Sequence, residues 1–78
     1  LPSPSGAAPL VVANLVAALH VALSPQLAAA VAPGGRLIAS GIFVDREGEA
    51  LDALCATGLI PIERWSDGEW VAHEFSGA

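Results

Sequence analysis

The residues best placed for chemistry are Asn14, Ser40 and Gly41. Asn14 directly follows an apolar run at residues 10–13, and Ser40 and Gly41 lie near the end of a second apolar run at residues 36–42. Both runs are short and show no alternation, which favours parallel strands buried on both faces. Open α/β sheets place their ligands at the carboxyl ends of such strands. Asn14 is therefore the best candidate for a functional residue, and Ser40 and Gly41 are expected to border a substrate cleft.

Each of these residues also has a purely structural interpretation. Asn14 is a favoured N-cap residue for a following helix. Leu15 either lines the same pocket as Asn14 or belongs to the core. Ser40 and Gly41 either border the cleft or form a strand-exit turn, since glycine permits a sharp change of direction.

The other reactive side chains favour structural roles. His20 has no partner at metal-ligand spacing, so we expect a packed or surface histidine and no metal site. Counted along a helix, His20 lies about 240° around from Asn14, so the two do not share a face. His73 lies within the last expected strand and is expected to be structural. Cys55 lies on an apolar helix stripe, as expected of an inert core thiol. Glu69 either neighbours the cleft or is a solvated hairpin residue.

The elements that position these residues begin with a strand at residues 10–13 and a short helix within residues 15–23. Ser24 as N-cap and Pro25 at the first helical position predict a second helix that runs to about residue 31. The Pro33-Gly34-Gly35 sequence ends that helix, and a strand follows at residues 36–42.

A third helix is predicted at about residues 46–57, with Asp45 as its cap and Gly58 in a left-handed conformation after its end. The stripe of this helix that faces the core comprises Ala50, Leu51, Leu54 and Cys55. A strand at residues 59–65 contains Pro61, which cannot donate to a ladder, so this strand belongs on a sheet edge. The last strand is expected at residues 70–75.

The Asp67-Gly68 dipeptide predicts a type I′ hairpin between the last two strands. With these two residues at the tip, Ser66 pairs with Glu69, and Trp65 lies opposite Trp70 on one face. We expect the two tryptophans to pack the hairpin onto the sheet. An aromatic cage for a methylated amine is the alternative, for which the sequence offers no third wall.

The fold class is therefore α/β, with the order β-α-β-α-β-β. Hydrophobic residues make up 54% of the 78 residues and charged residues only 14%, against roughly 25% charged in ordinary domains. The excess of apolar residues, and an entirely apolar first strand left as an open edge, indicate that more sheet precedes Leu1 in a parent protein. We expect the isolated chain to self-associate through residues 10–13 or through the face of the sheet that is left uncovered. Residues 1–9 are expected to be a loop or a truncation remnant, and residues 10–78 to form one unit.

The charge pattern and the single cysteine limit the possible partners and location. The net charge is −5, and the only bases besides histidine are Arg36, Arg46 and Arg64, which argues against direct nucleic-acid binding. No apolar run is long enough for a membrane span. A single cysteine fits a reducing compartment, so we expect a cytoplasmic protein.

Three segments resemble the ribosomal-protein methyltransferases of the PrmA type, within the class I S-adenosylmethionine-dependent methyltransferase superfamily. Residues 11–15 are similar to the strand-end motif VVAN-I/L of that family. Residues 33–42 resemble its PGGRLI-x-SGI segment, and residues 68–71 resemble its terminal GEWV. The match covers about residues 10–75. It departs from the family at Ala8-Pro9, where an acidic residue is usual, and the glycine-rich cofactor loop is not present.

The resemblance implies that residues 10–78 are the C-terminal half of a Rossmann-like catalytic domain, whose last strand inserts between the two before it. It implies a parent enzyme that uses S-adenosyl-L-methionine to methylate lysine and N-terminal amino groups of a large-subunit ribosomal protein, the eleventh. The cofactor would be bound mainly by the missing N-terminal half, with Asn14 and Leu15 closing the site. Asn14 would be catalytic by accepting a hydrogen bond from the target nitrogen. This chain alone is expected to be inactive.

Two alternatives remain. The chain is a fragment of a class I methyltransferase for a small molecule, which need not carry a substrate-recruiting domain, or it is a non-catalytic α/β module that self-associates through its open edge strand.

Overall fold

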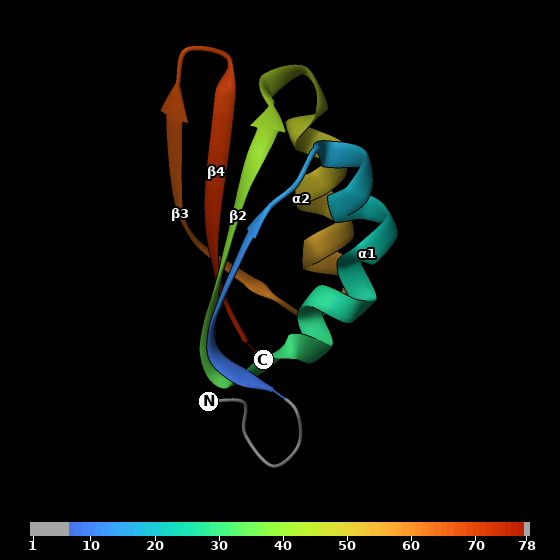
Figure 1. Ribbon diagram of the computed structural model, residues 1–78, viewed down its shortest axis with the longest axis vertical. Coiled ribbons are helices and arrows are strands. Elements are labelled where there is room, and N and C mark those ends of the chain that lie inside the picture. The colour runs from blue at the N-terminus through green and yellow to red at the C-terminus, as the bar shows by residue number, and fades with distance from the viewer. Residues whose placement is uncertain (1–6, 78) are drawn as a thin grey trace.

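The computed structural model describes residues 7–77, which form one mixed sheet and two α-helices on one side of it (Figure 1). The elements in chain order are β1 (Ala8–Asn14), α1 (Ala17–Ala30), β2 (Val31–Phe43), the 3₁₀ helix η1 (Val44–Arg46), α2 (Glu47–Ala56), β3 (Ile60–Asp67) and β4 (Trp70–Ser76). Ala8 and Pro9 belong to β1, which begins two residues earlier than expected. Most of the segment expected as a loop, residues 1–6, lies outside the described residues.

The strands are arranged in the order β1-β2-β4-β3. β1 and β2 are parallel, and β4 is antiparallel to both of its neighbours, β2 and β3. The predicted α/β order of elements and the insertion of the last strand are thus confirmed. β3 lies on the edge, as Pro61 requires, because a residue without an amide hydrogen cannot serve a central ladder.

Helix α1 is continuous through Pro25, so the two separate helices predicted before Val31 are wrong. Pro25 lacks the N–H that would bond to the carbonyl of Val21, one turn earlier. The Ser24 hydroxyl donates to that same carbonyl at 3.0 Å instead. Ser24 therefore replaces the missing donor inside the helix, where it had been expected to cap a new one.

The final hairpin differs from its predicted register. Asp67 pairs with Trp70, and Trp65 pairs with Ala72 rather than with Trp70. The two loop residues are Gly68 and Glu69, and only Gly68 has a positive φ, of 61°. A positive φ at the first loop position alone is the pattern of a type II′ turn, so the glycine starts the loop instead of ending it.

Helix α2 begins at Glu47, after η1, and its N-cap position is Arg46 rather than the predicted Asp45. Asp45 lies in the first turn of η1. The predicted end of this helix is confirmed, since Gly58 directly follows the C-cap residue Thr57 with φ of 98°.

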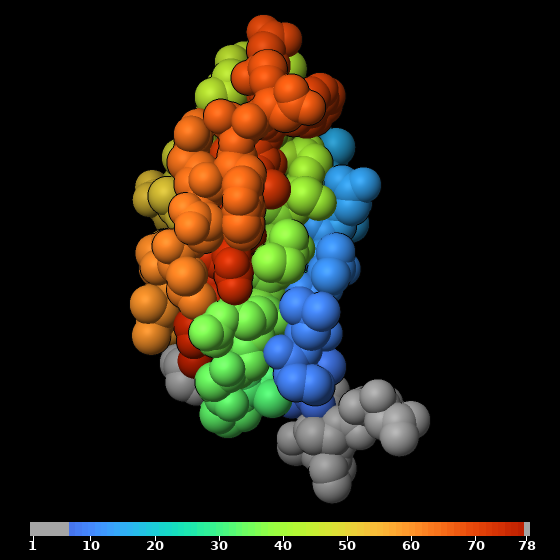
Figure 2. Space-filling view, turned by 90° about the vertical axis from the view of Figure 1, so that its left-hand side faces the viewer, coloured from blue at the N-terminus to red at the C-terminus, as the bar shows by residue number. Residues whose placement is uncertain are grey.

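The core lies between the sheet and the two helices. Its largest fully buried side chains include Leu37, Ile42, Leu54 and Phe75. The opposite face of the sheet is uncovered by the described residues, and all four strands are visible across it in Figure 2. On β1, Val11 and Ala13 pack against the core, while Leu10 and Val12 are 58% and 66% exposed. β1 is thus buried on one face only, not on both as expected.

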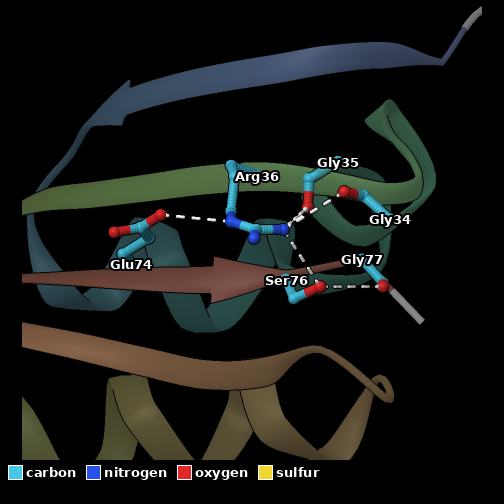
Figure 3. A network of polar contacts seen from close by, with 6 residues as sticks. All are labelled: Gly34, Gly35, Arg36, Glu74, Ser76 and Gly77. Carbon is cyan, nitrogen blue, oxygen red and sulfur yellow. Dashed lines mark hydrogen bonds and ion pairs between the residues drawn. The ribbon is translucent and has the colours of Figure 1, made fainter.

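In the first half of β2, the guanidinium group of Arg36 joins residues 34 and 35 to β4 (Figure 3). Arg36 donates to the carbonyl oxygens of Gly34 and Gly35 and pairs with Glu74 on β4 at 3.2 Å. Gly77 exchanges backbone hydrogen bonds with Gly34 and Gly35. These contacts fasten the end of β4 to residues 33–35, which belong to β2 and do not precede it as predicted. Within residues 7–77, neither α1 nor α2 is long and apolar enough to cross a membrane.

Candidate functional site

The carboxyl ends of β1 and β2 bring together three of the predicted site residues. Asn14 and Ser40 are neighbours in the parallel register. The Ser40 hydroxyl donates to Asn14 Oδ1 at 3.4 Å, and the backbone N–H of Leu15 donates to the Ser40 carbonyl at 3.1 Å. Asn14 alternates with Ala13, which packs into the core, so its side chain faces the uncovered side of the sheet. The Asn14 amide is therefore both oriented and accessible.

Gly41 completes this group because only a residue without a side chain fits there. It has φ of 80° and lies in a β-bulge, where β2 carries one more residue than β4 between the pairs at Ala39 and Ile42. A Cβ atom at Gly41 would lie 2.6 Å from Asn14 Oδ1 and 2.9 Å from the Leu15 carbonyl oxygen. The bulge thus brings the backbone of β2 directly against the Asn14 side chain.

The structure excludes the N-cap interpretation of Asn14. The N-cap position of α1 is Val16, and Asn14 lies two residues earlier, within β1. Its side-chain oxygen accepts from Ser40 rather than from a helix amide. Capping therefore does not account for an amide side chain at this position.

His20 is packed, one of the two placements expected for it, but its contact with the strand end was not predicted. It lies on α1, is fully buried, and its Nε2 is 2.9 Å from the Ser40 carbonyl oxygen. The helical angle between His20 and Asn14 has no meaning here, because Asn14 belongs to a strand. The available signal was that His20 is the only ionisable side chain between residues 15 and 35.

Two shallow hollows flank Gly41. One, of about 190 Å³, has Trp65 and Trp70 among its walls, together with Ser40 and Asp67. The other, of about 250 Å³, lies toward α1 and η1 and is lined by Val16, Phe43 and Arg46 as well as Trp70. Trp70 borders both hollows and packs edge-on against Phe43, with ring centroids 5.4 Å apart. Ser40 and Gly41 therefore do border concave surface, with aromatic walls supplied by the hairpin.

A separate polar cluster lies on the helix-covered side of the sheet. Glu47 on α2 accepts two hydrogen bonds from Arg64 on β3, at 2.5 and 3.0 Å, and lies 2.7 Å from His73 Nε2 on β4. The hydrogen bonds from Arg64 and His73 lower the pKa of Glu47 to about 2. His73 is 5% exposed. The cluster ties α2 to the edge hairpin, so a structural role for His73 agrees with its contacts.

Comparisons with known proteins identify the family. Residues 2–77 match the model of the family described as ribosomal protein L11 methyltransferase (PrmA). The chain is 49% identical over 70 residues to the ribosomal protein L11 methyltransferase of Chloroflexus aurantiacus and 51% identical over 67 residues to that of Pelotomaculum thermopropionicum. These matches cover 90% and 86% of this chain but only 21% and 22% of the relatives. The chain thus spans about a fifth of the length of the curated relatives.

A solved structure shares the fold. The crystal structure of a ribosomal protein L11 methylase from Lactobacillus delbrueckii subsp. bulgaricus superposes with a TM-score of 0.85 at 27% sequence identity. It covers 96% of this chain, which in turn covers 39% of that chain. The mixed sheet, the inserted last strand and the sequence match agree, and the chain belongs to the ribosomal protein L11 methyltransferase (PrmA) family.

Proposed function

We propose that this chain is the C-terminal part of a methyltransferase domain that methylates amino groups of ribosomal protein L11, on lysine side chains and the N-terminus. The observation that carries the proposal is the arrangement of Asn14, Ser40 and Gly41 at the carboxyl ends of two parallel strands. The names of the relatives support the substrate.

Asn14 would act by positioning the amine. A lysine, with a solution pKa near 10.4, must lose its proton before its nitrogen can attack a methyl group. An amide carbonyl oxygen has two lone pairs, and Ser40 engages one of them. The second remains for an N–H of the neutral amine, which directs the nitrogen lone pair away from Asn14. An amide cannot remove the proton, so its contribution is orientation.

The residues present fit only the margin of a cofactor site. Asn14 is exposed at the strand end, and Leu15, which follows it, is half-buried with its carbonyl packed against Gly41. S-adenosyl-L-methionine, when bound, supplies the methyl group. We propose that it is held mainly by sequence outside this chain, with Asn14 and Leu15 closing the site, and that the 78 residues alone are inactive.

The test is an Asn14→Ala substitution in the full-length parent protein, with Gln26→Ala, an exposed amide on α1, as the matched control. We expect kcat for methylation of L11 to fall by about 10- to 100-fold for Asn14→Ala, and to stay unchanged for the control. In Asn14→Asp, the carboxylate favours the charged amine, so the rate profile should shift to higher pH. Unchanged kcat in Asn14→Ala would refute the role of Asn14.

The same assay separates the protein substrate from a small-molecule one. Methyl transfer from labelled cofactor to purified L11 supports the proposal. Transfer only to small amines or other small acceptors would assign the chain to the alternative class. A cytoplasmic location is part of the proposal, and the single, partly buried free thiol of Cys55 supports it.

A specific observation also favours self-association of the isolated chain. Within residues 7–77, β1 pairs on one side only, with β2, and Leu10 and Val12 are exposed beside its unpaired backbone edge. Such an edge is a template for another strand. We expect concentration-dependent dimers or larger species in sedimentation velocity, and weaker association in Val12→Lys. A monomer at all concentrations would contradict this expectation.

A further inference from the structure

The carbonyl oxygen of Ser40 is the point where the helix layer meets the candidate site. It accepts the backbone N–H of Leu15 at 3.1 Å and lies 2.9 Å from Nε2 of His20. The hydroxyl of the same serine donates to Asn14 Oδ1. His20 is thus linked through one residue to the amide that we propose orients the amine.

The contact fixes the protonation of the imidazole at Nε2. A carbonyl oxygen only accepts hydrogen bonds, so the contact is a bond only if Nε2 carries the proton. In the neutral ring Nδ1 then carries the lone pair. Within residues 7–77, Nδ1 is buried and has no hydrogen-bond partner.

An unpaired buried acceptor is a cost that an apolar residue would not carry. Helix α1 is otherwise almost wholly apolar, with no acidic residue in its first turn and no basic one in its last. A leucine at this position would pack in the same surroundings without leaving a ring nitrogen unpaired. The benefit of His20 therefore lies in the Nε2 donor and its target, not in burial.

We propose that His20 is a positioning residue for methyl transfer. Its Nε2–H holds the Ser40 carbonyl, which keeps the Ser40 hydroxyl and the bulge at Gly41 aligned on Asn14. The proposal rests on the function proposed above for Asn14, and it adds a residue on the helix-covered side of the sheet that touches neither substrate nor cofactor.

The test is a double-mutant cycle in the full-length parent protein. His20→Leu removes the donor, whereas His20→Gln keeps an N–H donor at nearly the position of Nε2. We expect His20→Leu to lower kcat by about 10-fold or more, with KM for the cofactor unchanged, and His20→Gln to restore most of the rate. In an Asn14→Ala background, His20→Leu should cause no further loss, because the residue through which it acts is gone.

The outcomes separate the two proposals. If Asn14→Ala keeps full activity, the proposed role of Asn14 is refuted, and the role of His20 that rests on it is refuted with it. If Asn14→Ala is impaired but His20→Leu is not, or if its effect simply adds to that of Asn14→Ala, the positioning role of His20 is refuted. Equal losses in the glutamine and leucine variants would refute it too.

A measurement on the unmodified protein does not depend on any variant folding. Nitrogen NMR of the full-length protein labelled at histidine should show His20 as the Nε2–H tautomer, with slow exchange of that proton. A His20 ring protonated at Nδ1 alone would overturn the proposal.

Discussion

Replacing Gly41 by alanine tests how closely the β2 bulge approaches the candidate catalytic amide. Gly41 and Gly34 both lie on β2 with positive φ, of 80° and 74°. An alanine at either position lowers the free energy of unfolding by about 1–2 kcal/mol, because its Cβ is strained in the left-handed backbone conformation. The two positions differ in their surroundings, because a Cβ at Gly34 meets nothing within 4 Å, whereas one at Gly41 lies 2.6 Å from Asn14 Oδ1. Gly34→Ala is therefore a matched control for backbone strain.

The steric contact sets the size of the effect. Asn14 Oδ1 must move by about 0.8 Å to reach 3.4 Å, where ordinary contact begins, and the Leu15 carbonyl at 2.9 Å must also give way. Overpacking of this kind lowers the free energy of unfolding by about a further 1–3 kcal/mol. A displacement approaching 1 Å at a positioning group lowers a rate by about 10- to 100-fold. We expect Gly41→Ala to lose this much activity and Gly34→Ala to lose little.

The assay measures urea unfolding and methyl transfer to L11 in the full-length protein, with rates corrected for the folded fraction. Equal losses of stability in the two variants would show that the bulge is not tightly packed against Asn14. A Gly41→Ala variant that is destabilised but fully active would show that the position of Asn14 does not matter for the reaction.

Two further predictions concern stability. Glu47→Gln should lower the urea midpoint at pH 7. The pKa of Glu47 in the folded protein, about 2, is below its usual value of 4.5, so the stabilisation is present above pH 4.5 and is lost as the pH falls toward 2. The urea midpoints of the two proteins should therefore converge near pH 2. A constant difference from pH 7 to 2 would argue against the ion-pair explanation. Ser24→Ala should lower the free energy of unfolding by about 1 kcal/mol, because the Val21 carbonyl loses its hydroxyl donor. The loss should be smaller in a Pro25→Ala background, where a backbone N–H is restored to that carbonyl. The same cost in both backgrounds, from chemical denaturation, would refute the compensation.

Local chemistry was enough to predict the order of elements and much of the topology. Pro61 cannot serve a central strand, and Gly58 suits a left-handed helix end, so each was placed correctly from its residue type alone. Asn14 and Ser40 were expected at the same end of the sheet because Asn14 follows one strand-like run and Ser40 lies near the end of another. The parallel register brings them side by side.

The errors arose where two local signals competed or where packing decided. Gly68 satisfies either hairpin type, so the two-residue loop moved by one position, and the partner of Trp65 by two, without breaking a turn rule. Ser24-Pro25 is a good helix start in isolation, but α1 continues through it because the helix packs along the sheet as one unit. The His20 contact crosses from a helix to a strand end and depends on their packing, which no spacing in the sequence encodes.

The inserted position of β4 has a consequence for how the chain reaches this structure. β3 is synthesised before β4, yet β4 is the only described strand that β3 pairs with. Until β4 emerges, β3 is an unpaired segment with Ile60 and Ile62 exposed, and even in the finished sheet both side chains remain about half exposed. Pro61 lies between them and lacks the amide hydrogen that a further ladder would need, so we expect it to disfavour pairing with other nascent chains. By this reasoning, the residue that assigns β3 to the sheet edge should also protect the strand while its partner is still being made.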